Sequence, residues 1–367
     1  MRRLDIVVIG LSLSSSWGNG HATTYRALLK ALTARGHAIT FLEREQPWYA
    51  ANRDLQEPGW CRLVHYRSLA ELQSFTREIA AADAVIVGSY TPEGIAAGTY
   101  VQRIARGVTA FYDIDTPVTL AALERGDCAY LSPEQIQGYD LYLSFTGGPL
   151  LQLIEERYGS PAARALYCSV DTESYRPLDS EKRWDLSYLG TYSADRQPIL
   201  ERLLIEPARR MPELRFAVAG PQYPAAIEWP DNVERIDHVA PADHAAFYAA
   251  SRWTLNVTRA DMVKAGYSPS VRLFEAAACA TPIVSDRWKG IETIFENRRS
   301  IMLASTAQDV MRILGQKNAA KIGAAARRVI EQGHSAAHRA AELEGLLLEA
   351  AASKPAPAMP AVAGAAS

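Results

Sequence analysis

Short apolar runs alternate with longer amphipathic stretches along most of the 367-residue chain. The runs are continuously hydrophobic rather than alternating, which is typical of parallel strands covered on both faces. In the first half of the chain they lie at 6–9, 39–42, 84–87, 108–112 and 141–145. Strands that alternate with helices predict right-handed crossovers and a doubly wound sheet.

The same pattern begins again after a polar stretch at 171–184, which predicts a linker between two domains. The second series of apolar runs lies at 186–189, 216–219, 253–257, 282–285 and 301–303. We therefore predict an α/β chain in which two doubly wound, Rossmann-like domains face each other across a cleft. The expected parts are a first domain at 1–170, the linker at 171–184, a second domain at 185–334, a C-terminal helix at 335–352 and a disordered, Ala- and Pro-rich tail at 353–367.

Composition excludes several classes of function. The net charge is −2, so no overall basic field is present to recruit nucleic acid or anionic lipid. The four cysteines are widely spaced and form no CxxC pair, which argues against a zinc or disulfide framework. No apolar run approaches the roughly 18–20 residues of a membrane span, and no signal peptide is recognisable. We expect a cytoplasmic protein without an integral membrane segment, whose oligomeric state stays open.

Ligands bind at the carboxyl ends of strands in open α/β sheets, so the residues directly after each apolar run are the candidate site residues. The first run is followed by a loop containing Gly18, Asn19 and Gly20. The glycines would let the backbone approach an acceptor or a diphosphate closely. His21 follows and is a candidate general base. A loop that only turns, with His21 solvated, is the alternative.

Asp113 and Asp115 follow the fourth of these runs. Residues two apart in an extended chain share a face, so both carboxylates are expected to point into the cleft. They could bind the acceptor, act as a general base or hold a metal, although we expect no metal; a helix N-cap before 117–124 is the alternative. Gly147 and Gly148 follow the fifth run and would either contact the acceptor or an anion, or form a tight turn.

An anion site is expected in the second domain. Its first apolar run ends at Gly190, and Arg196 precedes the next helix, where its guanidinium can bind phosphate oxygens. Ser270 is predicted to be the N-cap of a later helix that starts at Val271. The N–H groups at that helix N-terminus suit a diphosphate.

Glu275 lies about one and a half turns inside the same helix, among apolar residues. A buried carboxylate is costly unless it is paired, and a carboxylate here can accept both hydroxyls of a ribose. Arg272, three residues earlier on the same helix face, is the alternative partner. Tyr267 and Ser268 in the preceding loop are expected to contact the same nucleotide.

The run 268–286, with R-L-F-E-A-A-A-C-x-T-P, resembles the donor-site motif of GT-B glycosyltransferases, and most closely that of the group named for the spore-maturation protein CgeB. The glycine loop, Asp-x-Asp-Thr-Pro, Cys-Ser-Val-Asp at 168–171 and the Gly190 to Arg196 segment agree in order, over about residues 1–330. The resemblance implies metal-independent, hexosyltransferase-like transfer from a nucleoside diphosphate sugar. It also implies that Glu275 binds the ribose, and that the helix start at Ser270 and Val271 binds the diphosphate.

The stereochemistry of transfer stays open at this point. Retaining relatives carry E-x7-E, and Tyr267 stands where the first Glu would be. Inverting relatives use a His base at the position equivalent to His21. The expected partners are the sugar nucleotide and a small-molecule, glycan or protein acceptor, with no nucleic acid. A nucleotide-sugar epimerase, a hydrolase and a non-catalytic sugar-nucleotide binding protein are the alternative functions.

Overall fold

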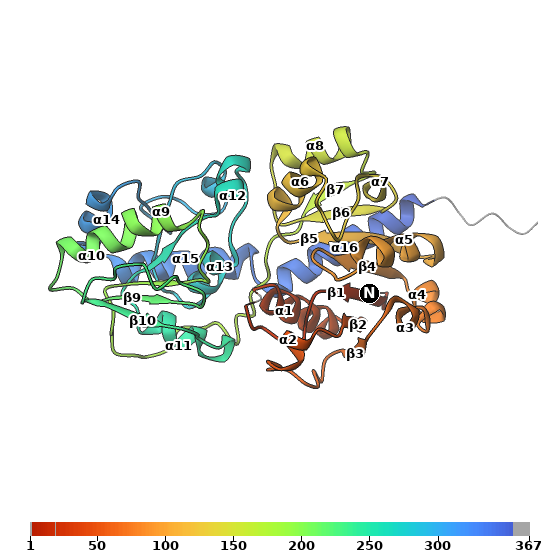
Figure 1. Cartoon of the computed structure of the whole chain (residues 1–367), viewed down its shortest axis with the longest axis horizontal. Helices are drawn as coiled ribbons and strands as arrows, with labels where there is room; N and C mark the ends of the chain where they lie inside the picture. The colour runs from red at the N-terminus through yellow and green to blue at the C-terminus, as the bar shows by residue number, and fades with distance from the viewer. Residues whose placement is uncertain (1, 19, 355–367) are drawn as a thin grey trace, which may run out of the picture.

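The computed structural model describes residues 2–18 and 20–354, which form two α/β lobes lying side by side (Figure 1). The first lobe is built on a seven-stranded parallel sheet of order β3-β2-β1-β4-β5-β6-β7. Its strands are β1 (Asp5–Gly10), β2 (Ala38–Arg44), β3 (Arg62–Tyr66), β4 (Ala84–Gly88), β5 (Val108–Asp113), β6 (Leu141–Ser144) and β7 (Ala163–Ala165).

Helices cover both faces of this sheet (Figure 1), so its central strands are buried on both sides. Ile6 and Val8 of β1 pack into one hydrophobic cluster, and Val7 and Ile9 pack into the other, which explains the continuous apolar runs. The helices of the lobe are α1 (His21–Ala34), α2 (Pro47–Ala50), α3 (Leu69–Gln73), α4 (Thr76–Ala81), α5 (Gly94–Ile104), α6 (Thr116–Arg125), α7 (Pro133–Ile136) and α8 (Pro149–Tyr158).

The second lobe repeats the plan with a six-stranded parallel sheet of order β10-β9-β8-β11-β12-β13. Its strands are β8 (Leu186–Leu189), β9 (Phe216–Ala219), β10 (Val233–Ile236), β11 (Thr254–Asn256), β12 (Ile283–Ser285) and β13 (Met302–Leu303). Its helical segments are α9 (Gln197–Leu200), the π-helical η1 (Glu201–Ile205), α10 (Glu206–Arg210), η2 (Pro241–Asp243), α11 (His244–Ala249), α12 (Ala260–Ala265), α13 (Val271–Ala278), η3 (Ile291–Thr293), α14 (Ala307–Leu314) and α15 (Ala319–Gly333).

The predicted pair of doubly wound sheets is confirmed, but the apolar runs did not reveal three of the strands. β3, β7 and β10 all lie at or toward an edge of their sheet. An edge strand is partly exposed and tolerates charge, as Arg62 in β3, Arg164 in β7 and Glu234 in β10 show. Short or charged strands of this kind lack the continuous hydrophobicity that identifies the central ones.

The last helix, α16 (Ala336–Ser353), returns from the second lobe and packs against α1 and β5 of the first (Figure 1). Glu344 of α16 forms an ion pair with Arg35 at 2.6 Å, and the Ala336 amide donates to the carbonyl of Val170 at 2.9 Å. The helix expected at 335–352 thus belongs by packing to the first lobe. Residues 355–367 of the expected tail lie outside the described residues. Within the described chain, no helix combines the length and apolar character that crossing a membrane requires.

Candidate active site between the lobes

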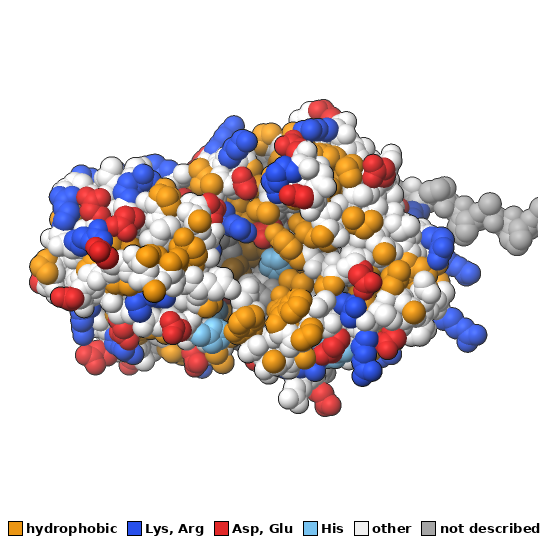
Figure 2. Space-filling model, viewed as in Figure 1, with side chains coloured by type: hydrophobic (Ala, Val, Ile, Leu, Met, Phe, Trp, Pro, Cys, Tyr) orange, Lys and Arg blue, Asp and Glu red, His pale blue; other side chains and the backbone are white. Residues whose placement is uncertain are grey.

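A cavity of about 430 Å³ lies between the two lobes. Figure 2 shows the hollow between them, with hydrophobic side chains along its rim. Ten residues proposed from the sequence line this cavity: Gly18, Gly20, His21, Asp115, Gly190, Arg196, Ser270, Val271, Arg272 and Glu275. Five others among the described residues lie elsewhere: Asp113, Gly147, Gly148, Tyr267 and Ser268. Asn19 falls outside the described residues.

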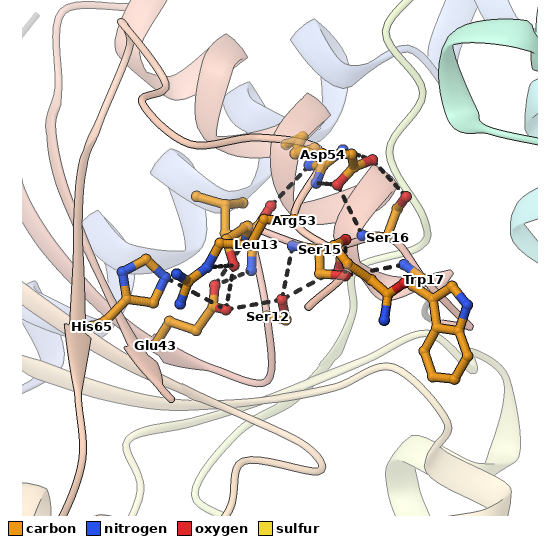
Figure 3. A network of polar contacts seen from close by, with 12 residues as sticks. Ser12, Leu13, Ser15, Ser16, Trp17, Glu43, Arg53, Asp54 and His65 are labelled. Atoms are coloured by element: carbon orange, nitrogen blue, oxygen red, sulfur yellow. Dashed lines mark hydrogen bonds and ion pairs between the residues drawn. The ribbon is translucent and has the colours of Figure 1, made fainter. Parts of the chain in front are cut away.

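The loop between β1 and α1 is anchored by Glu43, a buried carboxylate near the end of β2. Figure 3 shows Glu43 linked to Ser12 and Leu13 of the loop. The carboxylate accepts hydrogen bonds from the Leu13 amide at 2.6 Å, the Ser14 amide at 2.9 Å and the Ser14 hydroxyl at 2.6 Å. These donors compensate the desolvated charge, and they anchor the beginning of the loop that carries Ser16 and Gly18 to the cavity. The sequence signal for it was a Glu directly after a buried apolar run.

His21 is the first residue of α1, with Gly20 at the N-cap. The imidazole Nε2 lies 3.7 Å from Oδ2 of Asp115, and its ring centroid lies 5.3 Å from that of Tyr90. This start brings His21 to the cavity wall. His21 and Asp115 therefore form a pair built from two separate strand ends of the first lobe.

Asp115 occupies the N-cap position of α6, but its carboxylate faces the cavity. Oδ2 accepts a hydrogen bond from the Tyr90 hydroxyl at 3.1 Å and lies 3.6 Å from the Arg259 guanidinium of the other lobe. Burial opposes ionisation of this carboxyl. The hydrogen bond and charge of His21, together with the charge of Arg259, outweigh burial and lower the pKa of Asp115 below its ordinary value. Asp115 is thus a charged group of the site.

The expectation that Asp113 shares the cleft with Asp115 is wrong. Alternation of side chains requires an extended chain, and β5 ends at Asp113 before the turn into α6. Asp113 is fully buried and accepts hydrogen bonds from the Tyr142 hydroxyl, the Thr119 hydroxyl at 2.8 Å and the Asp115 amide at 3.2 Å. Burial raises the pKa of Asp113 to about 6. Asp113 therefore supports the turn that presents Asp115.

Gly147 and Gly148 do not contact the cavity but join the lobes beside it, together with Tyr267 and Ser268. The Gly147 amide donates to the Tyr267 carbonyl at 2.9 Å, and the Thr146 and Ser268 hydroxyls are 2.8 Å apart. Gly148 has a φ of +64°, and a Cβ there would lie 2.4 Å from the Tyr267 ring. These four residues form an interlobe brace instead of lining the cavity, and a role for them in donor or acceptor binding stays a prediction.

Two arginines of the second lobe line the cavity in different ways. Arg272 donates to the Leu189 carbonyl and lies 4.8 Å from the Tyr188 ring centroid, so it is held by β8. The alternative that Arg272 pairs with Glu275 is therefore wrong. Arg196 donates to the Thr191 carbonyl at 2.7 Å, while its buried Nε has no partner among the described residues. Arg196 thus retains donor capacity at the cavity wall.

The start of α13 also faces the cavity. Ser270 is its N-cap residue, as expected, and its hydroxyl donates to Oδ1 of Asn256 at 2.6 Å. Because that hydroxyl is turned toward Asn256, the N-terminal turn is left open to an external anion. The helix dipole adds partial positive charge at this end.

Glu275 is 4% exposed and collects partners from both lobes. Oε1 accepts from the Thr23 hydroxyl of α1 at 3.4 Å, and Oε2 accepts from the Tyr248 hydroxyl at 3.3 Å. Nδ1 of His244 lies 3.5 Å from Oε2. Three side chains thus position the carboxylate at the cavity wall. Because each of these contacts is long, a ligand with better hydrogen-bond geometry can replace them.

Sequence reasoning missed Tyr90, Thr23, Arg259, His244 and Tyr248. Tyr90 follows β4 and Arg259 follows β11, so the strand-end rule could have found both. Thr23 lies in the first turn of α1 and contacts Glu275 only because the two lobes come together. His244 and Tyr248 are one turn apart on α11, a spacing that also fits an ordinary core-facing helix.

Residues 196–345 match the family model described as glycosyl transferase-like. A comparison with curated protein sequences gives no match. The structure is similar to sucrose-phosphate synthase from Thermosynechococcus elongatus, with a TM-score of 0.68 and 14% identity, over 96% of this chain and 100% of that one. The chain has the GT-B fold, and residues 196–345 resemble glycosyl transferases.

Two other solved structures agree with this fold. Anabaena HepE in complex with UDP-glucose has a TM-score of 0.67 and 12% identity, over 95% of this chain and 100% of that one. An α-glucosyltransferase in complex with UDP and a 13-mer DNA has a TM-score of 0.67 and 10% identity, over 95% and 100%. The GT-B fold predicted from the sequence is confirmed, and most of the family match lies on the lobe that contains Arg196, Ser270 and Glu275.

Proposed function

We propose that the chain transfers a sugar from a nucleoside diphosphate sugar to an acceptor hydroxyl, with the nucleotide bound by the second lobe. The observation that carries this proposal is the convergence of Glu275, Arg196 and the start of α13 on the cavity that also contains His21 and Asp115. The first three suit a nucleotide, and the last two suit proton transfer. Both sets face one cavity, as transfer between two substrates requires.

The second-lobe residues match the parts of a nucleoside diphosphate. Glu275 presents a desolvated carboxylate that can accept both ribose hydroxyls in place of Thr23 and Tyr248. Arg196 and the N-terminal turn of α13 supply positive charge for the diphosphate and stabilise it as it leaves. Two of the similar structures contain UDP or UDP-glucose, which supports a uridine nucleotide as the first donor to test.

His21 is proposed as the base that takes the proton of the acceptor hydroxyl, with Asp115 as its partner at 3.7 Å. A carboxylate beside an imidazole orients it and stabilises the imidazolium that forms on proton transfer. A base on the acceptor side of the donor sugar supports inversion of configuration. Tyr267, at the position of the first Glu of the retaining motif, belongs to the interlobe brace.

We also propose that the chain is a hexosyltransferase of the CgeB-like group, whose donor-site motif the run 268–286 resembles. We further propose that the reaction proceeds without a metal. The charges and dipole of the second lobe can meet the diphosphate charge without a cation. Activity should therefore survive EDTA. Loss of turnover with EDTA, restored by Mg²⁺ or Mn²⁺, would contradict metal independence.

A panel of uridine, guanosine and thymidine diphosphate sugars tests the proposed function. A ligand that binds the folded protein raises its melting temperature by mass action, so one nucleotide class should raise the Tm in proportion to the logarithm of its concentration. The same donor should release its nucleoside diphosphate faster when an acceptor mixture is added. If no donor in the panel shifts the Tm, the proposed function is wrong.

A further inference from the structure

We infer that Arg259 is a second diphosphate ligand, which exchanges between Asp115 and the phosphate oxygens and so links donor binding to the carboxylate that pairs with His21. This inference rests on the proposed function. Arg259 precedes α12 and follows β11, at the same edge of the sheet as the other donor residues. Its side chain is 38% exposed and lines the cavity.

The guanidinium of Arg259 has donor capacity to spare. Within the described residues its one ion pair is with Asp115, at 3.6 Å. A guanidinium has five N–H donors, and its planar fork matches phosphate oxygens in a bidentate manner. Arg272, by contrast, is committed to the Leu189 carbonyl and the Tyr188 ring. Arg259 is therefore freer than Arg272 to bind an anion in the cavity.

Asp195 connects the loop that contains Arg196 to the loop that contains Arg259. Its carboxylate accepts a hydrogen bond from the Ala260 amide at 2.9 Å, and Asp195 directly precedes Arg196 in the chain. Burial opposes ionisation of Asp195, but hydrogen bonds from Ser193 and Ala260, followed by the charges of Arg259 and Arg196, lower its pKa. Both guanidiniums thus lie near one carboxylate, on two loops tied together at the cavity wall. A diphosphate bound by Arg196 would therefore also be attracted by the positive charge of Arg259.

A diphosphate carries more negative charge than Asp115 and can engage two N–H groups of one guanidinium. Arg259 is therefore expected to turn toward the diphosphate when the donor binds. Asp115 then keeps His21 and Tyr90 as partners and loses a competing positive charge from the other lobe. The His21–Asp115 pair thereby loses its contact with Arg259 when the diphosphate leaving group is bound.

Calorimetric titration tests the phosphate contact. The probe is whichever of UDP, GDP and TDP binds the unchanged protein most tightly, and its nucleoside serves as the probe without phosphate. Arg259→Gln should weaken diphosphate binding about tenfold, or about 1.4 kcal/mol, and change nucleoside binding by less than about twofold. Lys264→Gln is the matched control, because Lys264 is an exposed cation of α12 and its substitution changes the net charge equally. An equal loss for diphosphate and nucleoside, or for both variants, would overturn the inference.

A double-mutant cycle tests the exchange with Asp115. Asp115→Asn should strengthen diphosphate binding about threefold when Arg259 is present, because the guanidinium loses its competing partner. In the Arg259→Gln background this gain should disappear. The same gain in both backgrounds would disprove the link. If none of the three diphosphates binds the unchanged protein, the proposed function itself fails. If one binds and only Arg196→Gln weakens it, the further inference alone fails.

Discussion

The hydroxyl of Thr23 in α1 donates a hydrogen bond to the carboxylate of Glu275 in α13, 3.4 Å away and in the other lobe. The residue proposed to bind the ribose is therefore also a contact between the lobes. A ribose that takes over Oε1 of Glu275 would replace Thr23. Nucleotide binding at Glu275 would therefore break a hydrogen bond between the two lobes.

Glu275→Ala is expected to weaken nucleoside diphosphate binding by about 1–3 kcal/mol, the range for a hydrogen bond to a charged group. Thr23→Val is the control, because it removes the interlobe hydrogen bond and keeps the carboxylate. Its affinity should stay within about threefold of the unchanged protein. Isothermal calorimetry measures both, and unchanged affinity in a folded Glu275→Ala variant would disprove the ribose role.

Tyr90→Phe is expected to lower turnover about tenfold, which corresponds to about 1.4 kcal/mol, because Asp115 loses the 3.1 Å hydrogen bond that orients it. Tyr130→Phe provides the control. The Tyr130 ring packs 4.7 Å from Tyr90, but its hydroxyl lies 2.8 Å from that of Thr119 and not at Asp115. Steady-state kinetics should show a loss of kcat in the first variant alone, with nucleotide affinity unchanged in both. Equal losses would mean that Tyr90 acts through packing.

Asp113 is expected to make stability depend on pH. Burial raises its pKa in the folded state to about 6, above the roughly 3.9 of an unfolded chain. Between these values the folded state binds more protons, so this carboxyl lowers stability as pH rises from about 4 to about 6. Asp113→Asn should remove that contribution, so the free energy of unfolding of the wild type relative to the variant should fall across this window. Urea denaturation at several pH values measures the difference, and a difference that does not vary with pH would contradict the buried-carboxyl account.

Gly148→Ala is expected to destabilise the protein more than Gly126→Ala. Both glycines have positive φ, +64° and +76°, so both substitutions introduce backbone strain. A Cβ at Gly148 would also lie 2.4 Å from the Tyr267 ring, whereas a Cβ at Gly126 meets nothing within 4 Å. Backbone strain of this kind costs about 1–3 kcal/mol, and it is larger at Gly148, whose ψ of −150° lies outside the left-handed region that Gly126 occupies. The additional loss at Gly148 therefore reports this strain and the contact with Tyr267 together. Thermal denaturation that gives equal losses for the two variants would contradict an interlobe brace at Tyr267.

The central strands and the donor helix could be predicted because their signals are local. A buried parallel strand needs several apolar residues in succession, and the Glu within the apolar segment 273–278 was conspicuous for the cost of burying it. The fate of Asp113 could not be predicted in the same way. Its position depends on where β5 stops, which is set by pairing with β6 and by the Tyr142 hydroxyl.

Contacts between the lobes were the least predictable from sequence. Tyr267 lies next to a motif that contacts the cavity, yet its backbone φ of +49° and the packing of Gly148 turn it toward the brace. Arg259 and Asp115 are 144 residues apart and meet only when the two sheets face each other. No periodicity or fixed spacing in the sequence identifies such pairs.

The central claim is that the second lobe binds the nucleotide while the first lobe provides the residues that react. Calorimetric titration of the nucleoside diphosphate into four variants tests it most directly. His21→Ala and Asp115→Asn should bind at least about as tightly as the unchanged protein, with turnover strongly reduced. Arg196→Gln and Glu275→Ala should each bind about tenfold more weakly, or about 1.4 kcal/mol. A tenfold loss in both first-lobe variants, with the second-lobe variants unaffected, would place the nucleotide in the first lobe and contradict the account.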